Sequence, residues 1–159
     1  MVLKVQILCF ILLSGLYWNI TKQEFYSVLK EDRIQKINQM IQKVEKQNAN
    51  ASLKNAYKGA LLMKKAGILE GSPGRKMEVF KQGSALLEKE IDKHPNNVEY
   101  RFLRLSIQEN APKILRYYKN IKADKTLIAN KYSGLDKELK IVIKAYTRKS
   151  KYLATNDLK

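Results

Sequence analysis

The sequence contains few of the residue types that most often carry catalytic chemistry. Among its 159 residues there is one cysteine, Cys9, and one histidine, His94. A single histidine cannot supply a histidine cluster or a zinc pair, and a histidine-based catalytic triad is disfavoured. Because His94 directly precedes Pro95, at an expected helix end, we interpret it as a partner of the helix dipole. The composition predicts a non-enzymatic protein that uses no cofactor and no metal.

Acidic residues are also scarce, with 15 Asp and Glu against 31 Lys and Arg and a formal net charge of +16. The positive electrostatic field of such a chain favours contact with anionic partners, which include nucleic acid, phospholipid head groups and anionic envelope polymers. Charge alone does not choose among them. Since 45% of the residues are hydrophobic, the chain is long and apolar enough to fold as one domain despite its charge.

Only one long apolar run is present, and it lies at the N-terminus, in "MVLKVQILCFILLSGLYW". Lys4 precedes an apolar core from Ile7 to Leu16, which is the layout of a secretory signal peptide. The core is shorter than the roughly 20 apolar residues of a membrane span. Residues 1–20 are therefore predicted to be a signal peptide or an uncleaved anchor, with residues 5–18 as the membrane segment; a buried first helix is the alternative. The predicted location is periplasmic or secreted.

Residues 21–159 show helical spacing of apolar residues throughout, and no strand-like alternation persists. Thr21 and Glu24 fit a capping box that begins a first helix reaching about Gln47. Gly59, inside the second helix, indicates a close contact with another helix. We expect a single all-α domain of about six helices, including the following ranges: 21–47, 53–67, 72–94, 97–110, 121–131 and 135–146.

The piece "GSALLEKEIDKHPNN" resembles the second helix and exit loop of a tetratricopeptide repeat. Gly83, Leu87 and Pro95 occupy matching positions, whereas Glu90 stands where that repeat has alanine, and there is no second copy. This one-copy resemblance implies antiparallel helical hairpins in a short array.

A wider resemblance covers most of the chain after residue 20. "LKNAYKGALLMKKAG" and "PNNVEYRFLRLSIQENAPK", followed by "NIKADKTLI", resemble short exported helical proteins of the Bacteroidetes and flavobacterial type. The resemblance implies a bacterial envelope or secreted setting, and it implies no particular activity.

Arg101 and Arg104 lie three residues apart and therefore share one face of a largely apolar helix. Charges in such a helix should be paired or should reach water along their aliphatic stems. Three carboxylates are candidate partners: Glu99, Glu109 and Asp124. The alternative is a ligand or partner groove formed by five polar residues: Arg101, Arg104, Gln108, Asn120 and Asp124.

Residues 111–159 contain 13 Lys and Arg against four acidic residues, with five tyrosines interleaved. Such tyrosines can stack on nucleic-acid bases or can pack against the fold. No nucleic-acid motif accompanies them, so nucleic acid is not the partner that we expect. Glu88 and Asp92 are interpreted as solvated surface charges.

These features together favour an exported helical binding or scaffold protein with a basic surface. Its partner would be a protein or an anionic envelope component, and its oligomeric state stays open. The alternative is a protein that binds nucleic acid, anionic membrane or anionic polymer largely through charge.

Overall fold

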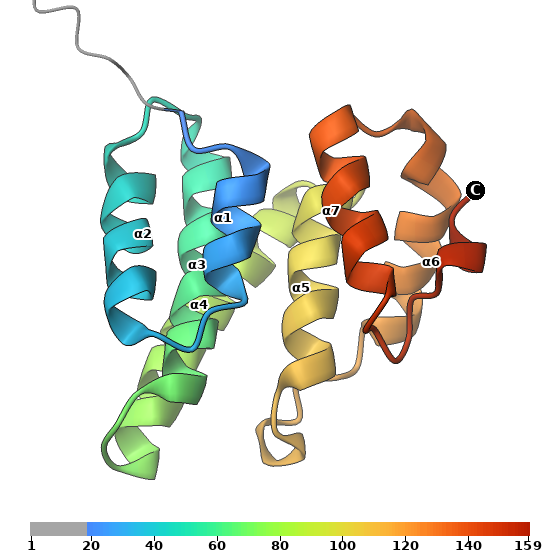
Figure 1. The fold of residues 1–159 in the computed structure, drawn as a ribbon. Helices are drawn as coiled ribbons and strands as arrows, with labels where there is room; N and C mark the ends of the chain where they lie inside the picture. Colours follow the sequence, from blue (N-terminus) through green and yellow to red (C-terminus); the bar gives the residue numbers. More distant parts are fainter. Residues whose placement is uncertain (1–18) are drawn as a thin grey trace, which may run out of the picture.

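The computed structural model describes residues 19–159, and within this range it contains seven α-helices and no strand (Figure 1). The prediction of an all-α fold is therefore confirmed. The apolar run expected to be a signal peptide falls almost entirely in residues 1–18, outside the described residues. The helices have the following bounds: α1 Lys22–Leu29, α2 Ile34–Lys46, α3 Ala51–Ile68, α4 Pro73–Lys93, α5 Val98–Asn110, α6 Ile121–Lys131 and α7 Lys137–Thr147.

Side-chain caps begin five of these helices. In each case an oxygen of the capping side chain accepts a hydrogen bond from the backbone N–H three residues further on, which satisfies a donor without a partner inside the helix. The five caps are Thr21, Asn50, Ser72, Asn97 and Asp136. Helix boundaries therefore follow local sequence closely, and Pro73 occupies the first turn of α4 as expected.

The expected single helix over residues 21–47 is wrong, because the chain leaves helical geometry between α1 and α2. Arg33 has an extended backbone, and its guanidinium binds the Glu31 carboxylate at 2.8 Å. Asp32 binds Lys64 of α3 at 2.7 Å. The capping box is also incomplete, since Glu24 binds Lys43 and does not reach back to Thr21. The charged turn between α1 and α2 is therefore held by these ion pairs, and α1 runs in a different direction from α2.

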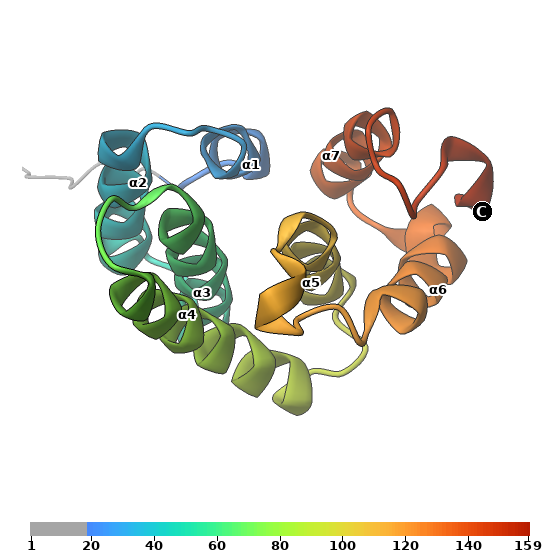
Figure 2. The same cartoon turned by 90° about the horizontal axis from the view of Figure 1, so that it is seen from below.

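The helices are arranged as a curved row around α5. In Figure 2, α1 and α7 lie at the two ends of the row, and α5 lies inside the curve. The ends meet, because α1 and α7 are in contact and the Lys22 N–H donates to the Glu138 carboxylate. Aromatic rings connect these elements through the interior, with ring centroids 5.4 Å apart for Tyr26 and Phe102 and 5.2 Å apart for Phe102 and Tyr146.

The most extensive helix contact is that between α3 and α4, and two glycines lie at its centre. A Cβ atom added at Gly59 would lie 2.7 Å from the carbonyl oxygen of Gly83. A Cβ atom added at Gly83 would lie 2.6 Å from the carbonyl oxygen of Gly59. Both distances are too short for a real contact, and the obstructing atoms belong to the backbone. The expected close contact at Gly59 is confirmed.

Replacing Gly59 with alanine should lower the free energy of unfolding by about 1–3 kcal/mol, because α3 and α4 must separate to admit a methyl group. Urea denaturation followed by circular dichroism measures this loss. Gly67→Ala is the matched control: a Cβ atom there meets nothing within 4 Å, so this helical position should gain up to about 1 kcal/mol. Equal midpoints for the two variants would contradict the proposed role of the glycine contact.

Candidate functional site

The arginines singled out in the sequence form an ion-pair cluster between α5 and α6. Arg104 binds Asp124 through two parallel hydrogen bonds, Nε to Oδ2 and Nη2 to Oδ1, both 2.7 Å long. Its remaining Nη1 donates to Glu88 of α4 at 2.6 Å. The Asp124 side chain is 0% exposed. This bidentate geometry is the strongest arrangement available to a guanidinium and a carboxylate.

The cluster extends at both ends. Arg101 donates from Nη1 to Asp124 at 2.8 Å and from Nε to the Pro95 carbonyl at 2.9 Å. The Tyr117 hydroxyl donates to Glu88 at 2.5 Å. Two arginines and two carboxylates thus balance in charge, and every member has a protein partner. Asp124, one of the three carboxylates expected as partners, therefore binds both Arg101 and Arg104.

The other two expected carboxylate partners serve different helices. Glu99 accepts hydrogen bonds from Lys22 and Tyr57, and Glu109 accepts them from Tyr146 and Ser150. Glu99 therefore joins α5 to α1 and α3, whereas Glu109 joins α5 to the C-terminal end of α7 and the turn after it.

Gln108 and Asn120 lie beside the cluster. Gln108 Nε2 donates to Asn120 Oδ1 over 3.5 Å, at the limit of a hydrogen bond, and the buried Gln108 Oε1 has no hydrogen-bond partner among the described residues. The structure therefore brings all five expected residues together, but their charged groups are occupied by one another. This geometry favours the paired interpretation over the ligand groove.

Glu88 departs from its expected role as a solvated surface charge. Its side chain is about one-third exposed and binds both Arg104 and Tyr117, whereas Asp92 is exposed as expected. Burial disfavours the charged guanidinium of Arg104, but Asp124 and Glu88 outweigh this effect and hold its pKa above the ordinary value. Burial and the nearby Glu88 charge raise the pKa of Tyr117 well above its usual value.

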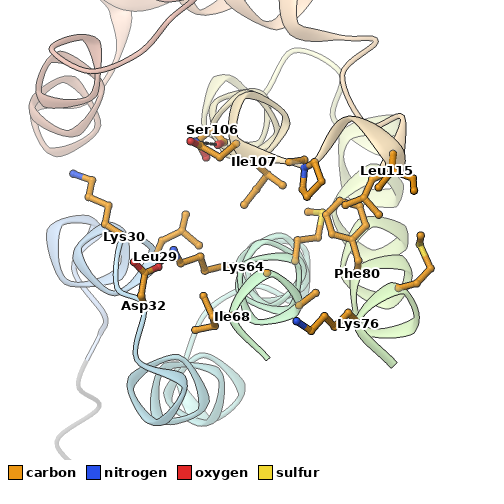
Figure 3. A pocket seen from close by; sticks show the side chains of 18 of the residues that line it. Leu29, Lys30, Asp32, Lys64, Ile68, Lys76, Phe80, Ser106, Ile107 and Leu115 are labelled. Carbon is orange, nitrogen blue, oxygen red and sulfur yellow. Dashed lines mark hydrogen bonds and ion pairs between the residues drawn. The ribbon is translucent and has the colours of Figure 1, made fainter. Parts of the chain in front are cut away.

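A groove with a volume of about 660 Å³ lies elsewhere, where the C-terminal ends of α1, α3 and α5 meet the first turns of α4. Figure 3 shows its lining side chains, which come from five helices and from the turn after α5. Most of them are apolar, including the following: Leu29, Met63, Ile68, Met77, Phe80, Phe102, Ile107, Ile114 and Leu115. None of the five residues predicted from the sequence lines it.

The groove has a basic margin. Four lysines contribute to its lining: Lys30, Lys64, Lys76 and Lys149. Asp32 is the only acidic side chain there, and it is engaged by Lys64 at 2.7 Å. Burial, and then the charge of Lys149, lower the pKa of Lys30 below its ordinary value. The groove therefore combines apolar walls with an excess of positive charge.

The tyrosines of the C-terminal third are mostly engaged within the fold. Tyr117 donates to Glu88, Tyr132 donates to the Lys140 carbonyl, and Tyr146 donates to Glu109. The exposed pair, at 52% and 45%, is Tyr118 and Tyr152. A base-stacking surface made of five tyrosines is therefore not formed.

Comparison with protein-family models, curated proteins and solved structures gives no match. Kinship with the exported Bacteroidetes proteins and with the tetratricopeptide repeat thus stays a prediction. Within residues 19–159, no cluster of three or more His, Cys, Asp and Glu side chains is placed to hold a metal ion. No helix in that range combines the length and the hydropathy needed to cross a membrane.

Asp124→Asn should lower the free energy of unfolding by about 3–5 kcal/mol, because it leaves the guanidinium of Arg104 buried without its main counter-charge. Thermal denaturation at neutral pH measures the loss. Asp92→Asn is the matched control. Asp92 is an exposed residue of α4, so this variant makes the same chemical change without a buried partner and should leave the melting temperature almost unchanged. Equal effects of the two variants would show that the cluster does not stabilise the fold.

Stability should fall as the pH rises above about 10, where a tyrosine of the unfolded chain ionises and folded Tyr117 keeps its proton. Tyr117→Phe removes this contribution, so the decline should become shallower by up to about 1.4 kcal/mol per pH unit. Urea denaturation of both proteins between about pH 9 and about pH 11 measures the two slopes. The ionisation of lysines contributes equally to the wild-type protein and the variant, so it cancels in the difference between their slopes. Identical slopes would contradict a raised pKa of Tyr117.

Proposed function

We propose that this chain is an exported, non-enzymatic binding protein of the bacterial cell envelope and that the groove is its binding site. One observation carries the proposal: the groove combines apolar walls with four lysines and a single carboxylate, which is already paired with Lys64. A volume of about 660 Å³ falls within the range of small-ligand sites. The groove is thus suited to an apolar ligand that also bears negative charge.

Its structural setting supports a binding role. The groove walls belong to helices fixed by the α3–α4 contact and by the aromatic contacts of Phe102, so the site is formed without a ligand. Preformed walls lower the ordering cost of binding. The envelope location in the proposal rests on the N-terminal apolar run and on the family resemblance, both of which are sequence observations.

A second candidate function follows from the net charge of +16, which favours binding of an anionic membrane, polymer or nucleic acid through charge alone. The two functions differ in their salt dependence. Binding by charge weakens steeply with added salt, whereas burial of apolar surface in the groove does not. The occupied tyrosines of the C-terminal third give the second candidate less support.

An apolar anionic dye, anilinonaphthalene sulfonate, tests the groove. The folded full-length protein should increase the dye's fluorescence, and Ile107→Gln should weaken binding by at least about tenfold because a polar group then stands in the groove wall. Ile141→Gln on α7 is the matched control, since Ile141 is 43% exposed and lies outside the groove. Equal binding by the two variants, or no binding by the wild-type chain, would overturn the proposal.

A further inference from the structure

We infer that the groove takes a single-chain amphiphile with a carboxylate head, of the kind represented by a long-chain fatty acid. The head would lie at Lys30 and Lys149, and the hydrocarbon chain would extend along the apolar walls toward Phe80 and Leu115. The inference rests on the proposed function and adds to it the chemical class of the ligand.

The groove is charged at its α1 side, whereas its α4 side is mostly apolar and carries one lysine, Lys76. Figure 3 shows Lys30 and Lys64 on the α1 side, and Phe80 and Leu115 on the side formed by α4 and the turn after α5. Ile107 of α5 lies between the two sides. A ligand with a charged end and a long apolar body matches this gradient, because each part meets a surface of its own kind.

Hydrogen bonding in the α5 wall favours hydrocarbon over peptide. Ser106 donates to the Leu103 carbonyl at 2.8 Å, and Asn110 Nδ2 donates to the Ser106 carbonyl at 2.8 Å. The Ser106 hydroxyl proton and one Asn110 N–H are therefore already used within α5. An extended peptide lying along this mostly apolar wall would leave most of its own N–H and C=O groups without partners, which is unfavourable. A hydrocarbon chain has no such groups to satisfy.

The charge at the α1 side lacks a counter-ion within the described residues. Lys30 and Lys149 form no salt bridge there, and the nearby Asp32 is engaged by Lys64. Lys30 and Lys149 are both exposed, and partial burial followed by repulsion from Lys149 lowers the pKa of Lys30. A carboxylate between the two lysines would offset both effects, whereas a cationic head would add to the repulsion.

The outer edge of the apolar side also has uncovered surface. Ile114, in the 3₁₀ turn Lys113–Leu115, is 84% exposed and is the most exposed large hydrophobic residue of the described chain. It lies in the groove lining beside Leu115. An acyl chain along this side would cover it and gain the free energy of removing apolar surface from water.

The test uses the full-length protein and cis-parinaric acid, a fluorescent fatty acid, below the concentration at which micelles form. We expect saturable binding that palmitate displaces. Cetyltrimethylammonium, which carries a chain of similar length and the opposite charge, should displace the probe at least about tenfold less effectively. Equal displacement by the two competitors would overturn the inference.

The head-group position is tested by the double variant Lys30→Gln with Lys149→Gln. It should bind palmitate about tenfold more weakly, because two charge contacts are lost. The matched control is Lys81→Gln with Lys89→Gln, which removes the same charge from exposed positions of α4 outside the groove and should leave affinity unchanged. Equal palmitate affinities for the two double variants would overturn the assigned head-group position.

Failure of the inference is distinguishable from failure of the proposed function. If anilinonaphthalene sulfonate binds with the expected dependence on Ile107 while parinaric acid does not, the groove is a binding site for another ligand class and the inference is wrong. Displacement of the dye by an acidic amphipathic peptide, and not by palmitate, has the same meaning. If neither the dye nor the fatty acid binds, the proposed function is wrong as well.

Discussion

The backbone contact between Gly59 and Gly83 determines how the other helices can be placed. Because neither residue carries a Cβ atom, α3 and α4 approach closely enough for a carbonyl oxygen of each helix to lie against the other. This hairpin then supports α2 on one side and α5 on the other. Its tip, between Ile68 and Pro73, forms part of the groove wall. The shape of the candidate site thus depends on a contact between two glycines that do not themselves line it, about one turn from the lining residues Met63 and Phe80.

The distribution of carboxylates explains why the groove is basic. The chain has only 15 acidic residues, and many of them bind groups in the interior or on another helix, including the following: Glu88, Glu90, Glu99, Glu109 and Asp124. Carboxylates that are bound to these partners are not available to the lysines of the groove margin. The margin of the groove therefore keeps an excess of lysines. The small number of Asp and Glu residues thus links the stability of the fold to the ligand preference of the groove.

Sequence reasoning recovered the features that depend on neighbours along the chain. The caps Thr21 and Ser72 and the glycine contact at Gly59 have local signals, and the structure has each of them. The break after Leu29 has only a weak local signal, because the four charged residues from Lys30 to Arg33 interrupt the apolar spacing but include neither Gly nor Pro. The role of Glu88 was missed because its partners lie 16 and 29 residues away. The groove was missed for the same reason, since its walls come from five helices.

The separation of α1 from α2 makes the first and last helices neighbours. An uninterrupted helix over residues 22–46 would be a straight rod about 38 Å long, fixed to α3 along its length. The eight-residue α1 instead turns away from α2 and contacts α7. In an open repeat array each unit touches only the next, and the ends can unravel independently. Here the ring of helices is closed at α1 and α7, so loosening of either terminus removes support from the other.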